Sequence, residues 1–171
     1  MSLVPAERET ARSVEDIWAR LERFAAEGAK PQLFKLRAQL LEQGRSDTPL
    51  AATDDLAVVL KVYASGGENA LHCHPNEDHV FIILAGAARF YGPSEEAVVL
   101  TQNQGIMLPR GTFYRFYVVS EEPLVMVRVG APANHKQPRP TRLDRDGNPM
   151  GGDAKENKTV PAIPKAGAYF G

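Results

Sequence analysis

Residues 66–86 read GGENALHCHPNEDHVFIILAG, and this stretch decides which fold to expect. It holds His72 and His74, two positions apart, then a turn, then His79 at the head of the apolar run 80–84. Side chains two positions apart on a strand point to the same face, so the first two imidazoles would enter one space. An adjacent antiparallel strand would bring His79 beside them. The stretch therefore predicts paired strands that gather three of the four histidines.

Short apolar runs closed by turn residues continue on both sides of this stretch. Such runs, bounded by Gly, Pro, Asn and Ser, are typical of β-strands. Eight of them with no helix between them predict an all-β fold, a sandwich or small barrel, rather than a parallel βαβ sheet. The predicted strands are 56–63, 69–74, 79–84, 88–91, 97–101, 106–108, 113–119 and 124–129.

The chain before these strands predicts a helix and one further strand. Apolar residues recur at spacings of three and four over 13–27, with Ser13 placed to cap the helix and Gly28 to end it. We expect this helix to lie over the core of its own domain. Residues 34–40 alternate with period two and favour a strand, and 44–49 are expected to form a loop.

Residues 131–171 contain six prolines and few apolar residues. This composition is typical of either a disordered tail or an ordered strap across the barrel, and the late apolar cluster around Tyr169 and Phe170 favours the strap. The expected organisation is a helical extension over 1–31, a β-barrel over 32–130 and a Pro-rich tail over 131–171.

Composition excludes several classes of protein. Hydrophobic residues make up 43% of the 171 and charged residues 24%, which is ordinary for a globular chain. A formal net charge of −1 argues against nucleic acid as a partner, and no apolar run is long enough to span a bilayer. The charged first twelve residues do not resemble a signal peptide. The single cysteine, Cys73, fits a cytoplasmic protein.

The three grouped histidines predict a metal site. Imidazole is the commonest metal ligand, and three of them with an open position form a working site. The alternative is a set of surface histidines around a turn. Glu77 and Asp78 are rivals to His79 as the third ligand, but the register favours His79 because Phe81 and Ile83 then share its inward face.

These residues resemble the first motif of the cupin superfamily, G-x5-H-x-H-x3-4-E-x6-G. A weaker second motif, G-x5-P-x-G-x2-H-x3-N, has a counterpart in which Tyr114 replaces the histidine and Val118 the asparagine. The resemblance implies a double-stranded β-helix (jelly-roll) barrel, usually dimeric, with one divalent metal in its mouth. The two matching segments are Gly66-(x5)-His72-x-His74-(x4)-His79-(x6)-Gly86 and Gly105-(x3)-Pro109-x-Gly111-x2-Tyr114.

The departures from the family pattern bear on the chemistry. The resemblance implies His72, His74 and His79 as metal ligands, with Tyr114 as a catalytic residue that orients substrate or as a fourth ligand. The alternative for Tyr114 is a core tyrosine in an aromatic strand. The implied cofactor is one divalent ion, Fe, Zn, Mn or Ni, with Fe or Zn favoured. Three neutral imidazoles would favour an anionic substrate that chelates.

The predicted function is a metal-dependent cupin enzyme, oxygenase- or isomerase-like, that acts on a small aromatic or enolisable molecule. The alternatives are a non-catalytic ligand-binding module and a barrel that binds metal only adventitiously. Because 80–84 is apolar on both faces, the outer face needs a cover, which the helix, a second sheet or a homodimer partner would provide. The expected inward wall is Phe81, Ile83, Phe90, Met107 and Phe116.

Overall fold

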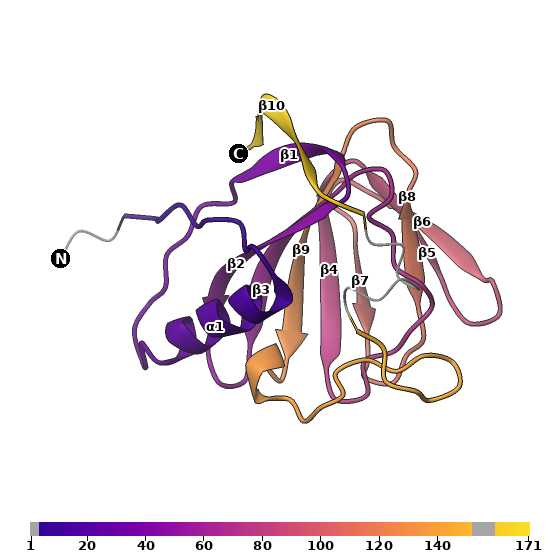
Figure 1. The fold of residues 1–171 in the computed structure, drawn as a ribbon, viewed down its shortest axis with the longest axis horizontal. Coiled ribbons are helices and arrows are strands. Elements are labelled where there is room, and N and C mark those ends of the chain that lie inside the picture. The colour runs from indigo at the N-terminus through magenta and orange to yellow at the C-terminus, as the bar shows by residue number, and fades with distance from the viewer. Residues whose placement is uncertain (1–3, 152–159) are drawn as a thin grey trace.

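The structure is a computed structural model that describes residues 4–151 and 160–171. One helix precedes a series of strands, and a single turn of 3₁₀ helix, η1, follows β9 (Figure 1). The elements are α1 (Val14–Ala25), β1 (Ala38–Gln43), β2 (Arg45–Ala52), β3 (Ala57–Tyr63), β4 (Asp78–Ala85), β5 (Ala87–Tyr91), β6 (Ala97–Thr101), β7 (Gly105–Leu108), β8 (Arg115–Val118), β9 (Leu124–Ala131), η1 (Asn134–Lys136) and β10 (Ile163–Phe170).

Two antiparallel sheets enclose the main core. The larger has the order β2-β3-β9-β4-β7 and the smaller the order β6-β5-β8. In the larger sheet Phe81 of β4 lies opposite Arg128 of β9 and Ile106 of β7, so these residues share the inner face. The sheets stay open rather than closing into a barrel, and the all-β jelly-roll prediction is confirmed.

The outer face of the larger sheet is covered by a small second sheet. In it β1 pairs with β10, which lies beside β1 across the top of the molecule in Figure 1. Alternate residues of β3 and β9 on this outer face, Leu60, Val62, Val125 and Val127, pack with Leu41 and the half-buried Phe170. Of the three covers expected for the outer face of 80–84, the second sheet reaches Leu84 within the described residues, and Ile82 stays exposed.

Helix α1 packs against β2, at the side of the larger sheet (Figure 1). The side chain of Ser13 accepts a hydrogen bond from the backbone N–H of Asp16, which caps the helix as the sequence predicted. Leu21 and Phe24 are buried against Ala57 and Val59, so the helix covers the core of its own chain. No helix among the described residues is long and apolar enough to cross a membrane.

Three predicted elements were wrong in extent or kind. The strand expected over 34–40 begins only at Ala38, and the loop expected over 44–49 is the first half of β2. Polar residues misled the prediction there, because Asp47 and its neighbours face a polar cavity rather than solvent. Residues 69–74 form isolated bridges, among them His72 with Tyr114, in place of a strand.

Met107 was predicted to face inward and does not. Its side chain is 63% exposed, because Ile106 and Leu108 are the β7 residues that face the core. Phe81, Ile83, Phe90 and Phe116 are buried as expected. The predicted strap over 131–171 includes β10, while its residues 152–159 lie outside the described residues.

Candidate metal centre

Four predicted site residues lie close together and are buried. His72 and His74 stand in the connection between β3 and β4, His79 in β4, and Tyr114 just before β8. Backbone hydrogen bonds tie the segments together, since the amide N of His72 lies 3.1 Å from the Tyr114 carbonyl and the reverse bond is 2.9 Å. The structure thus brings the histidine segment beside the tyrosine predicted from the second motif.

The tightest group is formed by His74, Glu77 and His79, whose ligand atoms all lie within 4.8 Å of one another. Nε2 of His79 is 2.7 Å from Oε2 of Glu77, and Nδ1 of His74 is 3.8 Å from the same oxygen. The two imidazole rings have centroids 4.2 Å apart. Two imidazoles and a carboxylate suit Zn and Fe alike.

His72 lies beside this group rather than within it. Its ring centroid is 5.1 Å from that of His74. Nδ1 of His72 donates to the Ala70 carbonyl at 2.7 Å, because a carbonyl can only accept. That bond fixes the tautomer and leaves the lone pair on Nε2, which is the usual arrangement of a ligating histidine.

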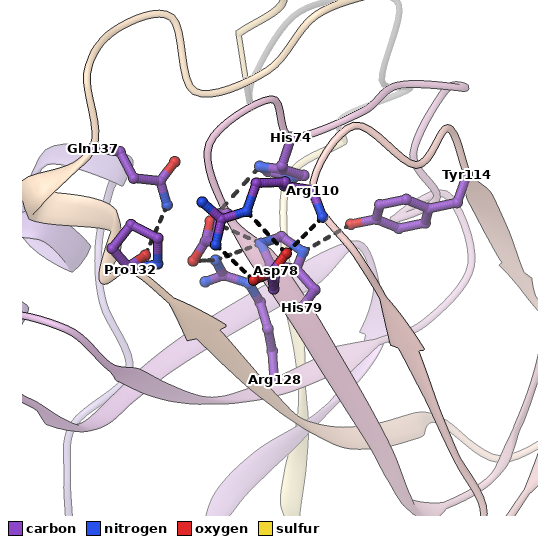
Figure 2. A network of polar contacts seen from close by, with 9 residues as sticks. His74, Asp78, His79, Arg110, Tyr114, Arg128, Pro132 and Gln137 are labelled. Atoms are coloured by element: carbon purple, nitrogen blue, oxygen red, sulfur yellow. Dashed lines mark hydrogen bonds and ion pairs between the residues drawn. The ribbon is translucent and has the colours of Figure 1, made fainter.

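Of the two acidic rivals to His79, the structure brings Glu77 to the cluster and turns Asp78 away. Glu77 joins His79 instead of replacing it. The carboxylate of Asp78 accepts hydrogen bonds from the backbone N, Nε and Nη2 of Arg110, on the exposed side of the turn (Figure 2). The sequence predicted one ligand, His79, from residues 75–79, whereas two of these residues, Glu77 and His79, lie in the cluster.

A glycine in β9 makes room for Glu77. Gly130 lies opposite His79 in the sheet, and a Cβ on it would stand 1.8 Å from Oε1 of Glu77. Such a contact is impossible without displacing the carboxylate. The absence of a side chain at Gly130 therefore helps to place Glu77 at the cluster.

The positively charged side chain of Arg128, in β9, contacts this cluster. Its Nη2 donates to Oε1 of Glu77 and lies 2.9 Å from Nε2 of His79 (Figure 2). Burial alone would raise the pKa of Glu77, but the charge of Arg128 and the hydrogen bond from His79 outweigh it and lower that pKa. Glu77 is therefore an anion at neutral pH.

The three histidines are neutral at neutral pH. Burial, with the nearby charge of Arg142, lowers the pKa of His72 to about 3. Burial, with the charge of Arg128, lowers the pKa of His79 to about 4, and the pKa of His74 also lies well below its ordinary value, chiefly through burial. Only neutral imidazole offers a lone pair to a metal, so these rings are ready to ligate.

Tyr114 stands at the edge of the cluster with its phenol turned toward His79. Its hydroxyl oxygen is 3.3 Å from Nδ1 of His79 (Figure 2). Burial raises the pKa of Tyr114, so the phenol keeps its proton. This position allows the phenol to hydrogen-bond to His79 or to a small molecule bound in the site.

Unpaired buried atoms test whether a metal fits here. Among the described residues, Nε2 of His72 and both ring nitrogens of His74 are buried without a hydrogen-bond partner. Buried polar groups are normally paired, and each unpaired one costs free energy. A cation held by Nε2 of His72, by one ring nitrogen of His74 and by Glu77 would pair two of these three nitrogens, so the donor set fits a divalent metal.

The cluster opens into a cavity of about 410 Å³ between the two sheets and the start of α1. His74, His79 and Tyr114 lie at its inner end, and Phe81 and Phe116 contribute apolar wall. The volume lies in the range of small-molecule sites.

Sequence reasoning missed two arginines that line this cavity, Arg128 and Arg142. A signal for Arg128 was present. It is the one charged residue in the apolar strand 124–131, and by parity it shares a face with Leu124 and Met126, which are buried. Arg142 gave none, because it lies in the Pro-rich segment where no periodicity assigns an inward face. Two other arginines in apolar strands lie elsewhere: Arg89 is exposed, and Arg115 forms an ion pair with Glu95.

Comparisons with known proteins agree with this fold. A model of the cupin domain family matches residues 59–130. The uncharacterised protein YdbB of Bacillus subtilis (strain 168) is 30% identical over 87 residues, which are 51% of this chain and 75% of that protein.

Solved structures give the same result. A protein from Klebsiella pneumoniae described as having a double-stranded β-helix domain superposes with a TM-score of 0.55 at 20% identity, over 61% of this chain and 88% of that one. KdgF from Halomonas sp. aligns with a TM-score of 0.49 at 21% identity, over 53% and 81%. With its jelly-roll sheets, its histidine motif and these matches, the chain belongs to the cupin superfamily.

Proposed function

We propose that this protein is a metal-dependent cupin enzyme that acts on a small aromatic or enolisable molecule. The observation that carries the proposal is the set of buried imidazole nitrogens that have no partner among the described residues and that stand beside the Glu77 carboxylate at the end of a cavity. Buried polar groups are normally paired, so three such nitrogens gathered in one cluster call for a partner.

The proposed ligands are His74, Glu77 and His79, with His72 completing the set through Nε2. The three-histidine site predicted from the sequence is thereby kept and gains a carboxylate. Fe or Zn is the favoured ion, and Mn or Ni suits the same donors. A bound divalent ion would supply Lewis-acid polarisation of a substrate oxygen.

The surrounding residues would bind and orient the substrate. The protonated phenol of Tyr114 can donate a hydrogen bond to a substrate oxygen, and the rings of Phe81 and Phe116 would exclude water from the reacting atoms. With a bound ion to polarise the substrate, such a site would support isomerisation or, with dioxygen as co-substrate, oxygenation. These two are the reaction classes that we propose.

A second candidate is a non-catalytic module that binds a small ligand. It is favoured by Arg128, whose guanidinium donates to Glu77 and lies beside His79, so the Glu77 carboxylate has a cationic partner without metal. In that case the cluster would be a fixed polar wall of the cavity.

Elemental analysis of the untagged protein, purified without added metal, separates the two functions. The wild type should hold one divalent ion per chain, and His74→Ala and Glu77→Gln should lose it while circular dichroism shows an unchanged fold. The jelly-roll has its own apolar core, so folding does not require the metal. The matched control is His135→Ala, because that imidazole lies outside the cluster.

Two results would contradict the metal proposal. One is a wild-type protein that holds no ion after incubation with Fe(II) or Zn(II) and desalting. The other is full metal content in both His74→Ala and Glu77→Gln.

The proposal also includes a cytoplasmic location and a homodimeric assembly. The location rests on the single cysteine, Cys73, which is buried and unpaired in the described structure. The assembly rests on two exposed apolar side chains, Ile82 of β4 and Met107 of β7.

A further inference from the structure

We propose that the cavity binds a small organic carboxylate and that Arg142 is the group that pairs with its charge. The role of this anion as substrate rests on the proposed function, whereas its binding can be tested without metal or turnover. The inference is carried by the charges that line the cavity, by the unpaired guanidinium nitrogen of Arg142, and by the apolar walls.

Among the described residues that line the cavity, no acidic side chain pairs with Arg142. Asp47 is paired with Lys61, and Glu77 of the neighbouring cluster is paired with Arg128, so neither is left to neutralise a further cation. The cationic residues among the described lining are Arg12, Arg45, Lys61, Arg128 and Arg142.

Arg142 stands out among these cations because part of its guanidinium is buried without a partner. Nη1 of Arg142 is inaccessible to solvent and donates a hydrogen bond to no described residue. Burial lowers the pKa of Arg142, and its charge in turn lowers the pKa of His72, His74 and His79, which places it near the cluster. A buried cation is normally paired, so an anion from outside the chain is the partner that this group lacks.

The shape and lining of the cavity favour a carboxylate on an apolar body. The planar guanidinium matches a planar carboxylate through two parallel hydrogen bonds. Tyr63, Phe81 and Phe116 line the same cavity, and its volume of about 410 Å³ suits a small molecule. A ligand with its carboxylate at Arg142 and its apolar part against these rings would occupy the same cavity that His74 and His79 line.

Benzoate binding to the full chain, freed of metal with EDTA, tests the proposal by titration calorimetry. We expect saturable binding of benzoate and none of benzamide, which has the same shape without the charge. Arg142→Met should weaken benzoate binding by about thirty-fold or more, the effect of removing one partner of a buried charge pair. Arg142→Lys should keep part of the affinity, and Arg89→Met, which removes an exposed arginine of β5, should keep all of it.

Thermal melts of the same variants separate binding from folding. Because Nη1 of Arg142 makes no hydrogen bond within the described chain, Arg142→Met should unfold at the wild-type temperature or above it. A lower unfolding temperature together with unchanged benzoate affinity would give Arg142 a structural role and overturn the proposal.

Three further outcomes would also overturn it: no benzoate binding, equal binding of benzamide, or tighter binding of phenyl phosphate, which would assign the site to phosphate esters. Metal content is measured separately. If the protein binds benzoate but holds no metal when metal is offered, this inference stands and the proposed metal-dependent function is contradicted. If it holds metal but does not bind benzoate, the metal-dependent function stands and this inference is contradicted.

Discussion

The geometry of the cluster depends on a few single residues whose effects oppose one another. Burial favours a protonated Glu77, yet Arg128 and His79 hold it as an anion. Gly130 leaves the space that the carboxylate occupies. Packing against Gly130 and pairing with Arg128 both position the Glu77 carboxylate. Substitutions at these residues should therefore weaken metal binding before they unfold the chain.

Tyr114→Phe should weaken metal binding by about ten-fold, since residues that orient a ligand contribute on that scale. The phenol lies 3.3 Å from Nδ1 of His79 and can hold that ring in place. Competition with a chromophoric chelator measures the affinity, and Tyr91→Phe, a tyrosine of β5 outside the cavity, is the control.

The same variant tests whether Tyr114 ligates. Because burial raises the pKa of Tyr114, we expect Fe(III)-loaded protein to lack a phenolate-to-iron absorption band. A band present in the wild type and lost in Tyr114→Phe would assign the phenolate to the metal.

Asp47 gives a pH dependence that is independent of metal. Burial raises its pKa, but the charge of Lys61 and its hydrogen bond outweigh this and hold the pKa below its ordinary value in the folded chain. The ionised form therefore stabilises the fold above about pH 4, and this contribution is lost as the pH falls through the folded-state pKa.

Asp47→Asn should accordingly lower the free energy of unfolding by about 1–3 kcal/mol at pH 7. The difference from wild type should shrink toward pH 3. Thermal melts across this range, with Glu121→Gln as an exposed control, would measure it. A difference that is the same at pH 7 and pH 3 would argue against the ion pair as its source.

At the scale of elements, the pairing of β1 with β10 joins segments more than a hundred residues apart. Ala38 lies opposite Phe170, and together they cover the outer face of β3 and β9. The main sheet would otherwise expose Leu60, Val62 and Val125 to water. The C-terminal strand therefore contributes to the stability of the sheet that positions His79.

Phe170→Ala should lower the free energy of unfolding by about 1–3 kcal/mol, less than for a fully buried phenylalanine because the ring is only half-buried. Urea unfolding measures this loss. Lys165→Ala, an exposed position on the same strand, should change stability little. Equal stability of Phe170→Ala and wild type would mean that β10 contributes nothing to the core.

At the scale of the whole molecule, part of the outer face of the larger sheet is left uncovered. Ile82 is 41% exposed and Met107 is 63% exposed, and both lie on the outer face of neighbouring strands, β4 and β7. The β1–β10 sheet packs on β3 and β9 and does not bury these two side chains. We propose that a second copy of the chain does so in a two-fold dimer.

Light scattering at micromolar concentration should then give twice the chain mass of 18.7 kDa. Met107→Glu should shift the mass to that of the single chain, because a charge at the centre of an apolar interface is not compensated. Val99→Glu, on the exposed face of β6, should leave the dimer intact. A single-chain mass for the wild type would contradict the dimer.

The sequence by itself determined the elements whose signal is local. Alternation of apolar residues placed β3 to β9 within a few positions, and the 3.6-residue period placed α1, because each pattern follows from which side of its own backbone is buried. The spacing of His72, His74 and His79 likewise predicted that the three rings lie together, since β4 and the short connection before it carry them all.

Only the tertiary structure decided what depends on partners distant in the chain. The turn at 75–78 could have presented Glu77 or Asp78, and the choice came from Arg128 and Gly130 on a strand some fifty residues away. Arg142 reaches the cavity from a segment with no periodicity of its own. Packing and charge pairing between such segments leave no local pattern, because their free energy arises only once the sheets have brought them together.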